Sequence, residues 1–155
     1  LATVDGTAQA DRRPDARTLL AATARLRYFV EAANAALHAD YRLYRDDWHI
    51  AAHTLELAWL QNLPAGWLLS PSLRGYSQDA AYFYAPFYDN ARSDGLASSD
   101  YRLSDYRALS LRLGALKRWE QLLLDVSVER YRSGHGNNPG LVDFDIVSLG
   151  LRYTF

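Results

Sequence analysis

The last nine residues of the chain alternate strictly between apolar and polar side chains. The apolar positions are Val147, Leu149, Leu151, Tyr153 and Phe155, and the residues between them are polar or glycine. Successive side chains of a β-strand point to opposite faces, so this period of two predicts a strand with different surroundings on its two sides. An amphipathic helix would instead need apolar residues spaced three and four apart. The end of the chain is therefore predicted to be a β-strand with one apolar and one polar face.

The same period of two recurs along most of the chain. A tilted strand needs about 9–11 residues to cross the hydrocarbon core of a bilayer, and each alternating segment is about that long or longer. The segment that begins near Thr18 is rich in Ala and Leu and has helical propensity, but the run Arg25–Tyr28 within it alternates. We predict strands at about residues 18–29, 35–44, 53–61, 67–78, 104–117 and 122–131, followed by the final strand at 147–155.

The connections between these predicted strands alternate in length. Membrane-spanning barrels have short turns on one side and long loops on the other, whereas a soluble β-sandwich has no reason to order its loops in this way. The sequence therefore predicts an all-β fold, an antiparallel up-and-down transmembrane β-barrel, in a single domain over residues 1–155. A periplasmic C-terminus would place every short turn in the periplasm. The short connections are 30–34, 62–66 and 118–121, and the long ones are 45–52, 79–103 and 132–142.

The composition is compatible with a barrel and excludes several other classes of protein. Hydrophobic residues make up 49% of the chain, yet the mean hydropathy is −0.27 and no apolar run approaches the ~18 residues of a spanning helix. A barrel strand is apolar on one face only, which explains this combination. The absence of cysteine excludes disulfides and thiolate metal sites. A net charge of −1 without a separate basic patch argues against nucleic acid as a partner.

Residues 1–16 are the least defined part of the chain, as a strand end and a loop. Residues 1–9 could be the end of an eighth strand, and an even strand number suits a closed single-chain barrel. This segment is short and poorly patterned, and Leu1 is not a native start. We therefore expect either that a signal peptide has been removed or that the chain is a longer protein's C-terminal part. The poor patterning of residues 1–9 favours the C-terminal portion of a larger barrel.

Four segments of the sequence resemble segments of a family of Gram-negative proteins described as a domain of unknown function. They are Tyr41–Trp48, His53–Trp59, Pro71–Gln78 and Asn138–Asp145, and the resemblance covers residues 25–155. It implies a topology and a compartment, the outer membrane of a Gram-negative bacterium, with membrane lipid as a partner. It supplies no catalytic residue and no substrate.

The final strand also resembles the terminal strand of Gram-negative outer-membrane barrels, whose closing aromatic residue is read by the barrel assembly machinery. The resemblance implies that this machinery is a partner of the chain. It also implies an assembly signal, which we expect to consist of Leu149, Leu151, Tyr153 and Phe155.

The charged side chains gather on the face opposite to the apolar one. A charge that faces lipid costs several kcal/mol at mid-bilayer, so these residues are expected to face a lumen. They could form a polar conduit that slightly favours anions, since arginines outnumber acids, or an ion-paired plug that fills a small barrel. Asp143 and Asp145 share the apolar face with Val147 and are expected at or above the outer headgroup boundary. The predicted lumen-facing residues are Arg25, Arg27, His38, Asp40, Arg42, Glu56, Arg74, Arg112, Asp125, Glu129 and Arg152.

Aromatic residues cluster at the ends of the predicted strands, which is typical of two girdles at headgroup depth. The loop at residues 80–90 is also aromatic and could bind a ligand, fold into the mouth as a constriction, or extend a strand beyond the membrane. One girdle would hold Tyr28, Phe29, Trp59, Trp67, Trp119, Tyr153 and Phe155, and the other Tyr44, Trp48, Tyr76, Tyr82, Tyr101, Tyr106 and Tyr131.

The sequence predicts no catalytic site, no cofactor and no metal. The histidines are His38, His49, His53 and His135, and their spacing in a loop and strands lacks the geometry of a metal or catalytic motif. We expect an outer-membrane barrel that serves as a passive, porin-like pore or as a structural wall. One alternative is a soluble β-barrel that binds an apolar ligand inside. A second alternative is an outer-membrane hydrolase that uses His38 or His53.

Overall fold

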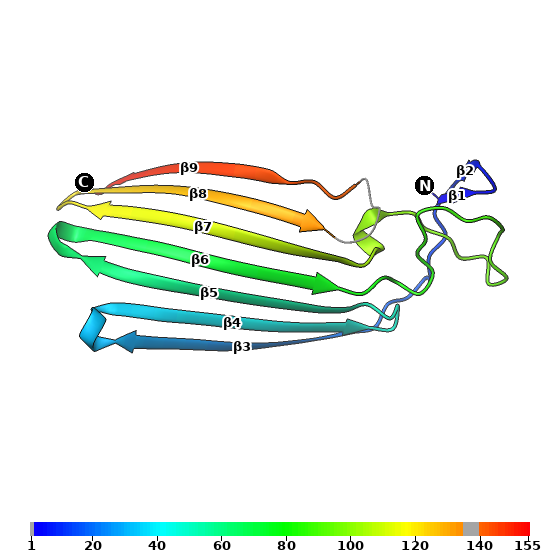
Figure 1. Cartoon of the computed structure of the whole chain (residues 1–155), viewed down its shortest axis with the longest axis horizontal. Helices are drawn as coiled ribbons and strands as arrows, with labels where there is room; N and C mark the ends of the chain where they lie inside the picture. Colours follow the sequence, from blue (N-terminus) through cyan, green and yellow to red (C-terminus); the bar gives the residue numbers. More distant parts are fainter. Residues whose placement is uncertain (1, 135–139) are drawn as a thin grey trace.

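In the computed structural model, which describes residues 2–134 and 140–155, a seven-stranded antiparallel sheet dominates the molecule. Each strand pairs with the next one along the chain, so the order in the sheet is the order in the sequence (Figure 1). This confirms the predicted all-β fold with antiparallel up-and-down order. The strands are β3 (Leu19–Val30), β4 (Ala35–Asp46), β5 (Ala51–Leu63), β6 (Trp67–Gln78), β7 (Tyr106–Arg118), β8 (Leu122–Gly134) and β9 (Phe144–Tyr153).

The short connections all lie at one end of the sheet, together with the C-terminus (Figure 1, left). Two of them are single 3-10 turns, η1 (Glu31–Ala33) and η2 (Pro64–Gly66). Gly66 has a φ of 75°, and a Cβ on it would lie 2.7 Å from the carbonyl oxygen of Arg118. Only glycine fits this position, because it tolerates positive φ and has no side chain to meet that oxygen. The long connections lie at the opposite end, as the alternating loop lengths predict.

A proline sits in the central strand β6, and the sheet accommodates it by a gap in one ladder. Ala58 pairs with Ser72 and Gln61 with Leu69, but the two β5 residues between them have no partner on β6. Pro71 lies opposite this gap, and it has no N–H to donate to the ladder. On its other side Pro71 pairs normally with Leu113 of β7. The ladder between β5 and β6 is therefore the one that lacks the N–H donor of this residue.

A small compact unit lies beyond the long-loop end of the sheet (Figure 1). We call it the cap and define it as residues 2–18 and 79–105. It contains the hairpin β1 (Ala2–Val4) and β2 (Thr7–Gln9) and the 3-10 turn η3 (Tyr101–Leu103). The hairpin forms its own two-stranded sheet. Residues 2–9 therefore do not form the end of an eighth strand of the main sheet, which was one of the possibilities that the sequence left open.

The hydrophobic core of the described residues lies in and under the cap rather than on the sheet. One cluster joins Trp48 and Ile50, from the loop between β4 and β5, to Ala81, Phe83 and Leu103. A second cluster packs Ala2 and Val4 of the hairpin against Tyr88. The aromatic loop at residues 80–90 therefore folds on itself and on the N-terminal hairpin.

The seven-stranded sheet is open. In the part of the chain that the structure describes, β3 and β9 each pair with one neighbour only. A closed barrel is thus not formed by these seven strands alone. No helix among the described residues has the length and apolar character needed to cross a membrane.

Candidate functional site

The register of the sheet places the eleven predicted polar residues on one face. Arg25 of β3 pairs with Asp40 of β4, which pairs with Glu56 of β5, which in turn pairs with Arg74 of β6. Because paired residues in a sheet point to the same side, these four side chains form a row across the strands. Further rows place the remaining seven on the same side, at Arg27, His38, Arg42, Arg112, Asp125, Glu129 and Arg152.

Part of this polar face is held by ion pairs and hydrogen bonds. Arg27 donates to both carboxylate oxygens of Asp40, at 2.9 and 2.7 Å, and Arg25 lies 3.7 Å from the same group. Arg112 donates to the hydroxyl of Ser127 at 3.1 Å. Near the middle of the strands, a hollow of about 220 Å³ is lined by two arginines and two glutamates, so its charges balance. The ion pairs of Asp40 with Arg25 and Arg27 fit the ion-paired alternative, whereas the balanced charges of the hollow lie near one another without forming ion pairs among the described residues.

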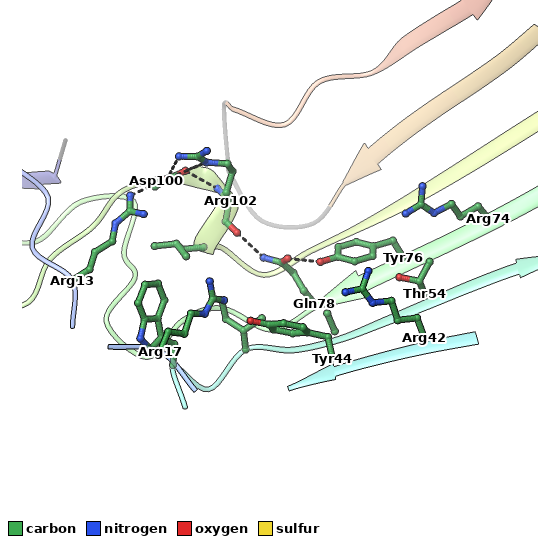
Figure 2. A pocket seen from close by; sticks show the side chains of 14 residues that line it. Arg13, Arg17, Arg42, Tyr44, Thr54, Arg74, Tyr76, Gln78, Asp100 and Arg102 are labelled. Atoms are coloured by element: carbon green, nitrogen blue, oxygen red, sulfur yellow. Dashed lines mark hydrogen bonds and ion pairs between the residues drawn. The ribbon is translucent and has the colours of Figure 1, made fainter. Parts of the chain in front are cut away.

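A larger hollow lies at the long-loop end of the polar face, where the sheet meets the cap (Figure 2). We call it the mouth pocket. Its volume is about 520 Å³. Five arginines line it and one carboxylate, Asp100. The lining residues are Arg13, Arg17, Arg42, Tyr44, Trp48, Ile50, Ala52, Thr54, Arg74, Tyr76, Gln78, Asp100, Arg102 and Leu103.

Three of the five arginines are neutralised by buried or partly buried carboxylates of the cap and of β4. Arg17 donates through Nε to Asp46 at 2.7 Å. Arg13 donates to Asp11 at 2.6 Å and to Asp100 at 2.9 Å. The hydrogen bonds from Arg102, the largest cause, and the one from Arg13 outweigh partial burial and hold the pKa of Asp100 well below its usual range. These pairs fix the wall of the pocket.

Arg42 and Arg74 have no carboxylate partner within ion-pairing distance among the described residues. Both are exposed, and both project from central strands into the pocket (Figure 2). Thr54 lies between Arg42 and Tyr76 in the register, and its hydroxyl also has no partner in the described part of the chain. Glu56 lies opposite Arg74 on β5 without forming an ion pair, and it lines the deeper hollows rather than this one.

The tyrosines of the mouth pocket present their rings, because their hydroxyls are already engaged. The Tyr44 hydroxyl donates to Asp46 at 2.8 Å, and the Tyr76 hydroxyl donates to Gln78 at 2.6 Å. The amide of Gln78 is itself used by the carbonyls of Arg102 and Ser104. The pocket thus combines uncommitted cationic donors with aromatic surface.

The opposite face of the sheet is apolar, and its large side chains have no protein cover. The exposed fractions are 75% for Leu149, 70% for Leu151 and 53% for Tyr153. Leu109 and Leu111 of β7 are exposed as well. The apolar residues predicted to alternate in the last strand therefore lie on the outside of this sheet, and none is packed in a core.

Charged residues occur on the apolar face chiefly at its long-loop end, and two pairs of them join β8 to the start of β9 and the residues before it. Arg130 donates to Asp145 at 2.9 Å, and Arg132 lies 3.3 Å from Asp143. These acids were expected near the outer headgroup boundary, and they do lie at the long-loop end of the sheet. Each is neutralised by an arginine of the neighbouring strand, β8.

The two aromatic clusters differ in the face that they occupy. Tyr28, Trp59, Trp67 and Tyr153 lie on the apolar face near the short turns, as a girdle requires. The prediction of a second girdle on that face is wrong, because the period of two puts the strand tyrosines near the long loops on the polar face. These are Tyr44, Tyr76, Tyr106 and Tyr131, and the Tyr76 and Tyr106 rings lie 5.2 Å apart.

The histidines are dispersed. His38 lies on the polar face, whereas His53 lies on the apolar face with its Nδ1 2.6 Å from the Tyr41 hydroxyl. His49 is in the β4–β5 loop with a φ of 69°, and His135 lies outside the described residues. No group of three or more potential ligands among the described residues could hold a metal ion.

Sequence patterning misses the part of the mouth pocket that the cap supplies. Alternation alone puts Tyr44 and Tyr76 on the face of Arg42 and Arg74. Nothing in the sequence places Arg13, Asp100 or Arg102 beside them, because these residues reach the pocket from irregular segments far apart in the chain. The signal that could have helped is the density of Arg and Asp in these loops.

Comparisons with curated proteins and with solved structures give no match. A family model does match, over residues 2–147, which is nearly the whole chain. The chain therefore belongs to the family described as "Protein of unknown function (DUF3570)".

Proposed function

We propose that this chain forms the wall of a β-barrel in a Gram-negative outer membrane and that its polar face lines a passive conduit that favours anions. It carries out no catalysis in this proposal. The observation that carries the proposal is the division of the sheet into an uncovered apolar face and a charged face with hollows.

The apolar face needs a covering that is not water. Uncovered leucine and valine side chains extend across the face from β3 to β9, and soluble monomers rarely expose a continuous apolar patch of this kind. Hydrocarbon tails would cover it without further protein. A strand of 12 residues, such as β4 or β6, rises about 3.3 Å per residue and spans about 30 Å at a tilt of roughly 40°, which is the thickness of the bilayer core.

The open edges also bear on the proposal. In hydrocarbon, every unpaired backbone N–H and C=O costs several kcal/mol, so a sheet in a membrane must close. We infer that β3 and β9 pair with further strands when the protein is in the membrane. Such a barrel would have more than seven strands. The conduit requires a barrel wider than eight strands, because side chains fill an eight-stranded interior.

The anion preference is inferred from the charges at the mouth. Five arginines and one carboxylate line the mouth pocket, and neither Arg42 nor Arg74 forms an ion pair in the described part of the chain. Arg74 also lines the hollow of about 220 Å³, where its charge counts against Glu56 and Glu129, so the excess positive charge at the mouth is carried most clearly by Arg42. A positive entrance raises the local concentration of anions and lowers that of cations. The ion-paired wall in the middle of the face would then keep the strands together without a strong preference of its own.

Reconstitution tests the proposal. The full-length protein, extracted in detergent, should migrate faster on gels before heating than after it, and it should conduct ions in a planar bilayer. Under a KCl gradient, the reversal potential should have the sign of an anion-preferring pore. A monomer that stays soluble without detergent would refute the membrane assignment, and an inserted barrel without conductance would refute the conduit.

Lipid-phase photoprobes separate this proposal from a soluble barrel that holds an apolar ligand. In the membrane, probes confined to the hydrocarbon should label Leu109, Leu111, Leu124 and Val126. The soluble alternative would turn these residues inward, so that a lipid-phase probe would spare them. Hollows of about 520, 420 and 220 Å³ lie on the charged face, and one of about 500 Å³ lies beside Leu109 at the long-loop end of the apolar face. The charged side chains that line the first three support a polar interior over an apolar one.

A further inference from the structure

We infer that the mouth pocket is a binding subsite for small organic anions that carry a flat ring, with Arg42, Arg74 and Thr54 holding the anionic group. The inference rests on the proposed function, since it names the class of solute that the conduit would select. It depends on which polar groups of the pocket already form hydrogen bonds or ion pairs within the protein and which do not.

Most polar groups of the mouth pocket are already used. Arg13, Arg17 and Arg102 are bound by carboxylates, and Gln78 donates to two backbone carbonyls. A ligand would have to break these contacts to use them. What remains are two guanidinium groups and one hydroxyl, on neighbouring strands of the rigid sheet.

These remaining groups suit a carboxylate. A guanidinium presents a planar fork of N–H donors that matches the two oxygens of a carboxylate, and charge-assisted bonds of this kind are among the stronger hydrogen bonds in proteins. Thr54, which lies beside Arg42 in the register, adds a third donor. Because all three come from strands rather than loops, the backbone needs little ordering when an anion binds, and the main cost is fixing the two exposed arginine side chains.

The aromatic surface of the pocket suits a ring attached to that carboxylate. The hydroxyls of Tyr44 and Tyr76 donate to protein acceptors, so these residues offer their rings to a ligand. Ring–ring contacts add attraction beyond the burial of area. The volume of about 520 Å³ lies within the range of small-molecule pockets and exceeds what an inorganic ion needs.

Quenching of tryptophan fluorescence by 4-nitrobenzoate can measure this binding on the full chain in detergent. Trp48 lines the pocket, whereas Trp59, Trp67 and Trp119 lie near the short turns at the other end of the sheet and act as an internal reference. We expect saturable quenching by 4-nitrobenzoate, and only weak, unsaturable quenching by its neutral counterpart 4-nitrobenzyl alcohol. Equal quenching by the two compounds would overturn the inference.

A double variant and a control variant test whether Arg42 and Arg74 bind the anionic group of the ligand. The double variant R42Q/R74Q should raise the dissociation constant at least about tenfold, since each lost bond is to a charged group. R118Q removes one guanidinium charge from the short-turn end of β7 and should leave the dissociation constant unchanged, whereas R42Q and R74Q made singly should each raise it. An unchanged constant in R42Q/R74Q, or an equal loss in R118Q, would contradict the assignment.

A variant that is expected to bind more tightly is also needed, because misfolding of R42Q/R74Q would weaken binding as well, whereas misfolding would not strengthen it. Glu56→Gln removes the carboxylate opposite Arg74 and should lower the dissociation constant by about threefold, the effect of one unit charge a few ångströms away in water-like surroundings. A higher constant in this variant would count against the inference. Binding is measured in detergent and conductance in bilayers, so saturable binding without conductance would refute the conduit alone, and conductance without binding would refute the subsite alone.

Discussion

At the scale of single residues, Asp46 joins the sheet to the cap. It is the last residue of β4, and its side chain is 0% exposed. One carboxylate oxygen accepts from the backbone N–H groups of Trp48 and Ile50, at 3.0 and 2.9 Å. The other accepts from Arg17 and from the Tyr44 hydroxyl. A single carboxylate thus shapes the β4–β5 loop and anchors the segment that leads from the cap into β3.

Substitution of Asp46 should therefore destabilise the cap. In D46N, the oxygen that accepts from Arg17 and Tyr44 becomes a donor, and two donors lose their acceptor. We expect a loss of about 2 kcal/mol in the free energy of unfolding, the usual magnitude for a bond to a charged group. Urea unfolding followed by near-ultraviolet circular dichroism measures it. Asp94→Asn breaks an exposed pair with Arg92 and should change the midpoint far less; equal effects would contradict this role of Asp46.

Acid should loosen the cap through Asp100. Its pKa is held below the ordinary value of 3.8, chiefly by Arg102 and also by Arg13. A depressed folded-state pKa contributes stability that is complete above the unfolded value and is lost as the pH falls through the folded value. Hydrogen exchange at Tyr88 and Ser98 should therefore be slow and constant from neutral pH to about pH 4, after correction for intrinsic rates, and should accelerate below it. In Asp100→Asn, these two amides should exchange faster already at neutral pH. Exchange rates equal to those of the wild type would contradict this explanation.

At the scale of elements, the part of β9 from Val147 to Tyr153 separates an apolar from a polar face. Leu149 and Ser148 are adjacent in the middle of the strand but point to opposite faces, and they pair with Val126 and Ser127 of β8. Strands β7 and β8 repeat this division. The preference of each strand for one orientation therefore comes from its alternating pattern, because a shift by one residue would exchange the faces.

A charge placed on each face in turn tests the division. Leu149→Arg puts a guanidinium on the apolar face near mid-strand and should cost about 2–4 kcal/mol of folding free energy in lipid vesicles. Ser148→Arg adds the same charge one residue away on the polar face and should be nearly neutral. Urea titration of the vesicle-inserted protein gives both values. A polar-face variant that is damaged as much as the apolar-face variant would mean that the sheet does not face lipid in this way.

At the scale of the whole molecule, the strand count of seven determines how the sheet can close. β3 and β9 both run toward the short-turn end (Figure 1), because alternate strands of a meander run the same way. A direct pairing of the two edges would be parallel. Antiparallel closure takes one further strand, or another odd number of them, whichever polypeptide supplies these strands.

Cysteine cross-linking distinguishes the two forms of closure. In the membrane-inserted protein, Ser148→Cys on β9 should form no disulfide with a cysteine at position 21, 23 or 25 of β3, because other strands separate the edges. The pair S127C/S148C, which is in register on β8 and β9, should cross-link readily and serves as the positive control. An efficient disulfide between β3 and β9 within one chain would establish direct parallel closure instead.

The strands were predictable because their information is local. The predicted segments at 35–44, 67–78 and 122–131 begin at the same residues as β4, β6 and β8. The start of β9 was placed less well, because the predicted strand begins at Val147 and the strand in the structure begins at Phe144. Asp143 and Asp145 disguise that start. They belong to a polar, paired end of the apolar face, and the pattern resumes only at Val147.

The candidate site was predictable only in its sheet half. The period of two places Arg42, Arg74 and the strand tyrosines on one face, although the same tyrosines looked like a girdle when they were counted by depth alone. The cap was not predictable, because its core is assembled from Trp48, Phe83 and residues of the N-terminal hairpin that lie far apart in the chain. The suggested assembly signal at Phe155 stays a prediction.

Local patterning is enough to specify the strands, their order and the separation of an apolar from a charged face, because alternation is a property of neighbouring residues. Three other features follow from the folded arrangement and not from any local pattern. The aromatic loop packs into a cap, three arginines of the mouth pocket are paired with carboxylates while two are not, and seven strands leave the sheet open. These features depend on contacts between distant segments. Their free energies are set by burial and by charge pairing that no local pattern records.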